Sequence, residues 1–244
     1  MNTEEFGKIT HLTPGRVFDS NSYWFKGGSF LKMDNCLYKE FEKALSEVKW
    51  VQDPAKVYNE IPEHIKLPES EIPKNLTRSQ TRDLLNAHAK KNFPEELKGS
   101  IEKLLLSYQT EELQSLYNFQ IVFADLWNGS EGCPWHWDGT DGGDALILAY
   151  FSDHKKWKPE LGGQLEIGKN LGSDSMYLSK IGEVESYGFV PPQQRSFIIV
   201  NNKNPYFIHR CNKLIDPKIR RMTLTLGLKF VVKDDWSQPS KVIW

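Results

Sequence analysis

The sequence predicts an α+β protein whose C-terminal half forms a β-sandwich or jelly roll, with helices packed against one of its sheets. The 244 residues, 39% hydrophobic and 26% charged, are enough for one large domain or for a core domain with an extension. Helical periodicity is confined to the first half of the chain. From Phe119 onward, short apolar runs alternate with polar turns, which is the pattern of successive strands.

The first half contains three expected helices. Residues 29–37 have the pattern of a strand that leads into a helix at 38–50. One face of that helix is apolar, with the i, i+3, i+4, i+7 spacing of Phe41, Ala44, Leu45 and Val48. A second helix begins at Pro94, because proline suits the first helical position, and a short third helix covers 110–118. Residues 52–74 contain four prolines and are expected to form an irregular loop.

The second half contains five apolar runs that we expect to be strands, at residues 119–127, 145–151, 162–168, 195–202 and 221–232. The polar stretch 169–188 between them is the expected mobile loop, and together with 52–74 it is expected to decide the substrate. We therefore divide the chain into a helical and loop support segment, 1–117, and a strand-rich core, 118–244, within one integrated domain.

Charge and hydropathy exclude several classes of protein. Lys and Arg number 31 against 32 acids, a net charge of -1, so a general attraction to nucleic acid or to an anionic membrane is not expected. Neither a membrane span nor a signal peptide is evident, which indicates a soluble cytoplasmic protein. The three cysteines, Cys36, Cys133 and Cys211, form no C-x-x-C pair and are interpreted as free thiols that fill the core.

The stretch "CPWHWDGTDGG" contains the pair His136-x-Asp138. Residues i and i+2 of an extended segment point to the same side, roughly 6.6 Å apart, so both side chains can reach one metal. A His-x-acid pair occurs about once by chance in a chain of this composition, and the pair alone is weak evidence. His209, in "NPYFIHRC", is the candidate third ligand, although an isolated histidine is more often structural.

Two imidazoles and one carboxylate leave three positions open on a metal, the arrangement of non-haem Fe(II) oxygenases, whereas zinc usually takes four ligands. The run "KIRRMTLTLGLKF" adds a cation. Alternation places Arg221, Thr223 and Thr225 toward the sandwich interior, opposite the leucines that should pack under the helices. An inward arginine suits a dicarboxylate cosubstrate, which a guanidinium can bind bidentately. An intramolecular salt bridge is the alternative.

Taken in order, His136-Trp137-Asp138, "ELGGQLEIG", His209-Arg210-Cys211 and Arg221-Met222-Thr223 resemble the 2-oxoglutarate and Fe(II)-dependent dioxygenases, in particular the prolyl 4-hydroxylase-like branch, over residues 119–232. The resemblance implies a double-stranded β-helix with His136, Asp138 and His209 as iron ligands. It also implies that Arg221 binds the distal carboxylate of 2-oxoglutarate. Tyr150 would donate to the same carboxylate and Thr223 would add a hydroxyl, the alternatives being a core aromatic and a strand position.

Trp127 stands near the position where the branch often has a tyrosine, and its indole cannot accept a hydrogen bond, so it is expected to line the pocket by packing alone. Trp135 and Trp137 are expected to pack outward. The implied reaction uses Fe(II), 2-oxoglutarate and O₂, releases succinate and CO₂, and hydroxylates a peptidyl, prolyl-like substrate or a small molecule. A nucleic-acid demethylase of the same superfamily and a non-catalytic jelly-roll binding module remain the alternatives.

Overall fold

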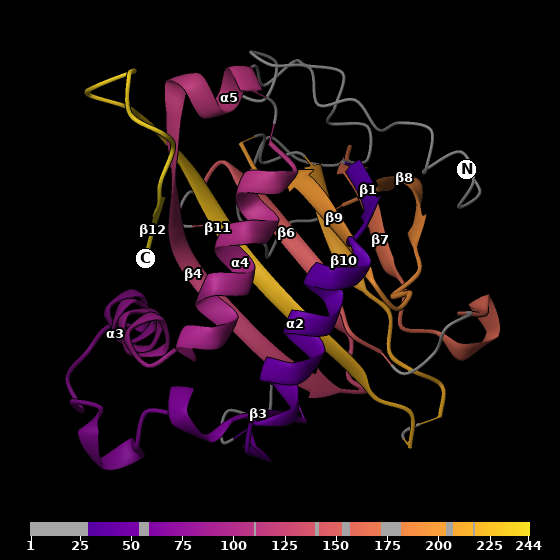
Figure 1. The fold of residues 1–244 in the computed structure, drawn as a ribbon. Helices are drawn as coiled ribbons and strands as arrows, with labels where there is room; N and C mark the ends of the chain where they lie inside the picture. The colour runs from indigo at the N-terminus through magenta and orange to yellow at the C-terminus, as the bar shows by residue number, and fades with distance from the viewer. Residues whose placement is uncertain are drawn as a thin grey trace.

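Two facing β-sheets form the centre of the protein (Figure 1). The computed structural model describes residues 29–53, 59–109, 111–139, 142–152, 157–171, 182–203, 207–216 and 218–244. The large sheet has the order β1-β9-β6-β11-β4-β3-β2, with β12 beside β4, and the small sheet has the order β5-β10-β7-β8. Eight strands make up the two central layers: β4 (Tyr117–Gly129), β5 (Cys133–His136), β6 (Ala145–Tyr150), β7 (Leu165–Asn170), β8 (Val184–Val190), β9 (Ser196–Asn201), β10 (Phe207–Cys211) and β11 (Arg221–Val232).

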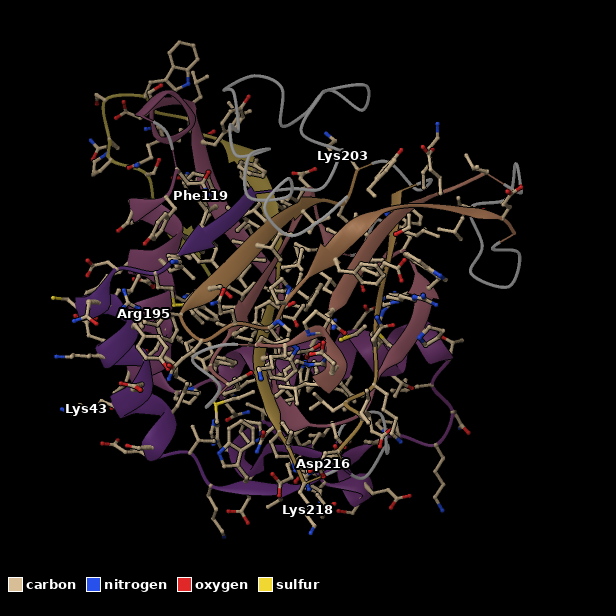
Figure 2. All side chains as sticks on the ribbon, turned by 90° about the vertical axis from the view of Figure 1, so that its right-hand side faces the viewer. Lys43, Phe119, Arg195, Lys203, Asp216 and Lys218 are labelled. Atoms are coloured by element: carbon tan, nitrogen blue, oxygen red, sulfur yellow. The ribbon has the colours of Figure 1, made fainter. Side chains whose placement is uncertain are left out.

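The order of these eight strands defines a jelly roll, or double-stranded β-helix. Along the chain, β4, β6, β9 and β11 enter the large sheet, while β5, β7, β8 and β10 enter the small one. All pairs among the eight are antiparallel. Figure 2 shows the crossing from end to end, with Lys203 before β10 at one end of the molecule and Asp216 and Lys218 after β10 at the other. The predicted fold class is therefore confirmed.

Two helices, α2 (Asn35–Ser46) and α4 (Glu95–Ser107), cover the outer face of the large sheet (Figure 1). The helix predicted at 38–50 starts three residues earlier, because the side chain of Asp34 caps α2 by accepting from the backbone N–H groups of Cys36 and Leu37. It also ends earlier. The apolar faces of both helices and of β11 meet in one core that contains Phe41, Leu97, Ile101, Leu224, Leu226 and Leu228.

A third helix, α3 (Arg78–Lys91), was not expected. Its sequence, RSQTRDLLNAHAKK, has too few apolar residues to show a helical stripe, because it borders solvent on most sides. The signal that could have found it is the capping box, in which Thr77 accepts from the N–H of Gln80 while the Gln80 side chain accepts from the N–H of Thr77. Helix α3 lies beside β4, where Lys90 Nζ donates to the carbonyl of Ile121.

Residues 52–74 are more regular than predicted. Strands β2 (Trp50–Gln52) and β3 (Glu60–Pro62) form a pair that extends the large sheet next to β4, and the short 3-10 helices η2 (Glu63–Ile65) and η3 (Glu69–Glu71) follow. Strand β1 (Ser29–Lys32) pairs with β9, and β12 (Val242–Ile243) runs parallel to β4. The predicted short helix at 110–118 is α5 (Glu111–Leu116), and η5 (Pro159–Leu161) precedes β7.

The predicted loop 169–188 is shorter on both sides than expected. Strand β7 continues to Asn170 and β8 begins at Val184, and the two pair up to these residues. The centre of the predicted loop, 172–181, lies outside the described residues. Among the helices that the structure describes, none has the length and apolar character required to cross a membrane.

Candidate active site

The three predicted metal ligands lie together at the edge where the small sheet faces the cavity. His136 ends β5, and its cross-strand partner on β10 is His209. Asp138 follows two residues after His136. Its Oδ1 lies 3.7 Å from His136 Nε2 and its Oδ2 lies 3.3 Å from His209 Nε2, while the two imidazole rings are 4.2 Å apart. One ligand atom of each residue lies within 4.8 Å of the others, which is the spacing of a site for a single ion.

The hydrogen bonds of His136 orient its ring for such a site. Nδ1 lies 2.7 Å from the carbonyl oxygen of Pro134, and since a carbonyl only accepts, Nδ1 carries the proton and Nε2 is left toward Asp138. Burial disfavours the imidazolium, but the hydrogen bond with Cys133 and the Asp138 carboxylate outweigh it and raise the pKa of His136 to about 9.

The second imidazole is in the opposite situation. Burial, followed by the charge of His136, lowers the pKa of His209 to about 4. His209 is therefore neutral near pH 7, the form that ligates a metal. Without a metal, the positive charge of the histidine pair therefore resides on His136, beside Asp138. A divalent cation bound by the three side chains would displace the proton from His136 Nε2.

A cavity of ≈ 520 Å³ opens next to the three residues, between the two sheets and helix α3. This volume is typical of a small-molecule site. Its inner wall is the row of β11 residues predicted to face inward, Arg221, Thr223 and Thr225. The other lining residues come mainly from β4, β5, β6 and α3 and include Phe123, Asp125, Trp127, Cys133, Tyr150, Cys211, Arg82 and Asn86.

Arg221 lies at the closed end of this cavity and is fully buried. Its Nη1 donates to the carbonyl oxygens of Gly163 and Asn212, and its Nη2 donates to that of Glu131, at 2.9 Å. The guanidinium also lies over the ring of Trp127, 4.8 Å from the centroid. No carboxylate of the described residues pairs with it, and its Nε has no acceptor among them, so the salt-bridge alternative is not observed.

The double glycine of "ELGGQLEIG" explains how this end of the cavity is built. Gly162 and Gly163 have φ angles of 72° and 75°, a region that side chains other than glycine rarely adopt. This turn directs the Gly163 carbonyl to Arg221. The three backbone carbonyls compensate only part of the charge of the buried Arg221 guanidinium. Its Nε lacks an acceptor among the described residues, so we expect an anionic ligand to bind there.

Tyr150 and Thr223 stand side by side next to Arg221. They are cross-strand partners on β6 and β11, exposed to 1% and 0%, and both hydroxyls lack a hydrogen-bond partner in the described part of the protein. Burial raises the pKa of Tyr150 well above its ordinary value, so its phenol stays protonated and can donate. With Arg221 Nε, three buried polar atoms thus face the cavity unpartnered, which native proteins rarely tolerate without a ligand.

The sequence analysis missed Asp125. This carboxylate lines the cavity from β4, and burial, then the charges of Asp138 and Asp53, raise its pKa from 3.8 to about 6. The cause of the omission is a β-bulge at Val122. Before it, Phe119 and Ile121 face the helices, and after it Ala124 and Leu126 do so, so the residues that face the cavity change parity along the strand.

The cysteines differ from the prediction in placement. All three are free, as expected, but Cys36 is exposed rather than buried in the core. Cys133 and Cys211 are cross-strand partners that line the cavity. Cys133 donates a hydrogen bond to Cys211, which raises the pKa of the Cys133 thiol and lowers the pKa of the Cys211 thiol.

The tryptophans beside the triad lie outside the cavity, as predicted. The guanidinium of Arg210 stacks over Trp135, at 4.9 Å, and Trp137 Nε1 donates to the carbonyl of Asn202, at 2.9 Å. These contacts fix the segment on both sides of His136. Trp127, in contrast, lines the cavity and packs against Arg221, also as predicted.

No family model matches the chain, and no curated protein matches it. Solved structures that it resembles include a prolyl-4-hydroxylase of Pseudomonas putida (15% identity, TM-score 0.43, covering 88% of this chain and 96% of that chain). A 2OG-Fe(II) oxygenase family oxidoreductase of Burkholderia pseudomallei has 10% identity, a TM-score of 0.47, and coverages of 90% and 93%. A prolyl hydroxylase of Trichoplax adhaerens, in complex with a hypoxia inducible factor peptide, has 16% identity, a TM-score of 0.47, and coverages of 93% and 93%.

Proposed function

We propose that this protein is an Fe(II)- and 2-oxoglutarate-dependent dioxygenase. One observation carries the proposal: a cavity with a His-Asp-His ligand set at its edge also contains, at its closed end, a buried arginine and two buried hydroxyls with unused donors. The first set fits a divalent metal and the second fits a carboxylate. A cosubstrate that both chelates a metal and ends in a distant carboxylate satisfies both.

The metal ligands in this proposal are His136, Asp138 and His209. Two neutral imidazoles and one carboxylate on one side of the ion favour iron over a closed zinc site, because they leave positions for the cosubstrate and O₂. Bound there with 2-oxoglutarate and O₂, iron would supply the oxidation of an unactivated C–H bond, with release of succinate and CO₂. The carbonyl of Pro134 holds the His136 ring in the tautomer required.

The residues for the distal carboxylate of 2-oxoglutarate are Arg221, Tyr150 and Thr223. Of the five guanidinium N–H donors, those of Nη1 are used by Gly163 and Asn212, and Nη2 donates to Glu131. The Nε–H and the remaining Nη2–H stay available for a bidentate interaction. Tyr150 and Thr223 add hydroxyl donors beside it. Trp127 seals this end by packing on the guanidinium, which excludes water from the charge pair.

For the substrate we propose a peptide with a prolyl-like target residue or a small molecule. The cavity volume of ≈ 520 Å³ accommodates the cosubstrate together with one side chain or a metabolite of similar size. A second cavity of ≈ 530 Å³ lies on the other side of Asn86. Because both cavities share a wall of α3, a chain longer than one residue has room to continue along that helix.

The experiment that tests the function is an anaerobic titration with Fe(II) and 2-oxoglutarate, followed by measurement of succinate on admission of O₂ with a substrate panel. Arg221→Ala should weaken 2-oxoglutarate by roughly 30-fold to several thousand-fold, because a buried charge loses its partner. Arg221→Lys should recover part of the loss, since it lacks the planar fork. Arg220→Ala, at an exposed neighbour, is the matched control.

Three outcomes would count against the proposed reaction, the proposed substrate or the proposed carboxylate anchor, respectively. Failure of the wild-type protein to bind Fe(II) after careful reconstitution would favour a non-catalytic binding module. Salt-dependent binding of single-stranded DNA or RNA, with succinate released from methylated bases, would favour the nucleic-acid demethylase. A large loss in Arg220→Ala with normal Arg221→Ala would contradict the assignment of the carboxylate anchor.

A further inference from the structure

Asp125 is a half-buried acid whose carboxylate has no partner among the described residues. It lies on β4 between two aromatic residues that also line the cavity, Phe123 and Trp127. In the described part of the chain, no hydrogen bond or ion pair involves its carboxylate, although Thr225 is its direct cross-strand neighbour. The two charges that act on it, Asp138 and Asp53, are both negative. An ionised carboxylate in such a place costs free energy unless a cation compensates it.

The two described cations that line the cavity, Arg221 and Arg82, do not fill this position. Arg221 lies on the same inner face but four cross-strand pairs away, at the Gly129 end of β4. Backbone carbonyls and the Trp127 ring hold its guanidinium there. Arg82 also lines the cavity, from the exposed side of α3, and it is not among the charges that shift the pKa of Asp125.

Phe123 adds an aromatic surface beside this carboxylate. Its cross-strand neighbour on β11 is Gly227, and a Cβ at that position would overlap the Phe123 ring. The glycine therefore leaves the ring room to lie against the sheet, with one side toward the cavity that Asp125 lines. A carboxylate next to an aromatic face is a combination that binds organic cations, through charge and through cation–π attraction.

We propose that Asp125 and Phe123 bind a cationic group of the substrate, an ammonium or a guanidinium, and so select substrates that carry one. The inference rests on the proposed function in that the cation belongs to the molecule oxidised at the triad. Asp138 connects the two positions, because it is a triad member and its charge acts on Asp125 more strongly than that of Asp53. A substrate bound in this way extends from Asp125 past Asp138, with its reacting carbon at the triad.

The test uses the N-acetyl methylamides of arginine and lysine, with those of citrulline and norleucine as uncharged counterparts of similar shape. Binding is measured by calorimetry at about pH 8, where Asp125 is ionised, under nitrogen with Mn(II) and 2-oxoglutarate so that no turnover occurs. The wild-type protein should prefer arginine over citrulline, or lysine over norleucine, by roughly 10- to 100-fold, the range of a hydrogen bond to a charged group.

Asp125→Asn keeps the shape of the side chain and should abolish this preference. Glu160→Gln removes the same charge from an exposed site on η5 and should retain it. Phe123→Leu should weaken both cations but leave the uncharged compounds nearly unaffected. Equal binding of charged and uncharged compounds by the wild type, binding of neither charged compound, or a preference that survives in Asp125→Asn would each overturn the inference.

The Mn(II) and 2-oxoglutarate titrations separate this inference from the proposed function. If the protein binds both but shows no preference for cations, only the inference fails. If it prefers cations in an Asp125-dependent manner but binds neither Mn(II) nor 2-oxoglutarate, the cation site stands and the dioxygenase assignment fails.

Discussion

Replacing Asp125 by asparagine should stabilise the metal-free protein at neutral pH. Burial and two neighbouring carboxylates raise the pKa of Asp125 from 3.8 to about 6. Between these values the folded chain binds more protons than the unfolded chain, so the stability of the wild type falls as the pH rises from about 4 to 6. A neutral asparagine does not undergo this loss.

The magnitude follows from the shift. A displacement from 3.8 to about 6 corresponds to about 3 kcal/mol at 1.36 kcal/mol per pH unit. Asp125 is partly accessible from the cavity, and water there reduces the effect, so we expect a gain of about 1 to 3 kcal/mol. The gain should be near zero below about pH 4, increase through pH 6 and remain constant at higher pH.

Urea unfolding followed by circular dichroism, in the presence of a chelator at about pH 5, 6, 7 and 8, measures this difference. Glu160→Gln should show no comparable pH-dependent gain. If Asp125→Asn is no more stable than the wild type at pH 8, or if its gain is the same at all four values, Asp125 is not the uncompensated carboxylate inferred above. A residue that lowers the stability of the free protein is expected at a binding site. A cationic ligand would compensate the carboxylate charge that no described residue neutralises.

Two further outcomes are expected at the triad and at the closed end of the cavity. His209→Ala should lose Fe(II) and Mn(II) binding. Its far-UV circular dichroism should stay nearly unchanged, because the sheets and not the imidazole hold β10 in place. Full iron-dependent turnover by this variant would refute the ligand assignment. Tyr150→Phe should weaken the binding of 2-oxoglutarate roughly tenfold. The free energy of unfolding should stay equal or increase, since the hydroxyl that is removed has no partner among the described residues. An unchanged affinity for 2-oxoglutarate would show that Tyr150 does not bind the cosubstrate.

Strand alternation was sufficient to predict the inner face of β11. Alternation predicts that Arg221 points inward and Arg220 outward. In the structure Arg221 is fully buried and Arg220 is exposed. The same rule placed His136 and Asp138 on one side of an extended segment. Such predictions succeed where a strand is regular and one face meets a helical layer, because a shift of one residue would bury charge and expose leucine.

Helix α3 could not be predicted in this way because its stability does not come from an apolar stripe. Among the side chains of α3 whose burial is described, only that of Ala89 is buried. The helix is defined instead by a capping box and by contacts with β4, such as that of Lys90 with Ile121. Its consequence for the site is nevertheless large, since Arg82 and Asn86 form one wall of the cavity. Elements of this kind border binding sites because they carry few packing constraints.

The bulge at Val122 links the fold to the proposed choice of substrate. With a regular β4, the residues Phe119, Ile121, Phe123 and Asp125 would share one face, and Asp125 would then lie under the helices. The extra residue turns Phe123 and Asp125 toward the cavity while Ala124 and Leu126 continue the core. The alternation of apolar and polar residues cannot assign the two faces of such a strand, because it does not show where the extra residue is inserted. A single local irregularity therefore both hides Asp125 from sequence analysis and supplies the carboxylate that we expect to select cationic substrates.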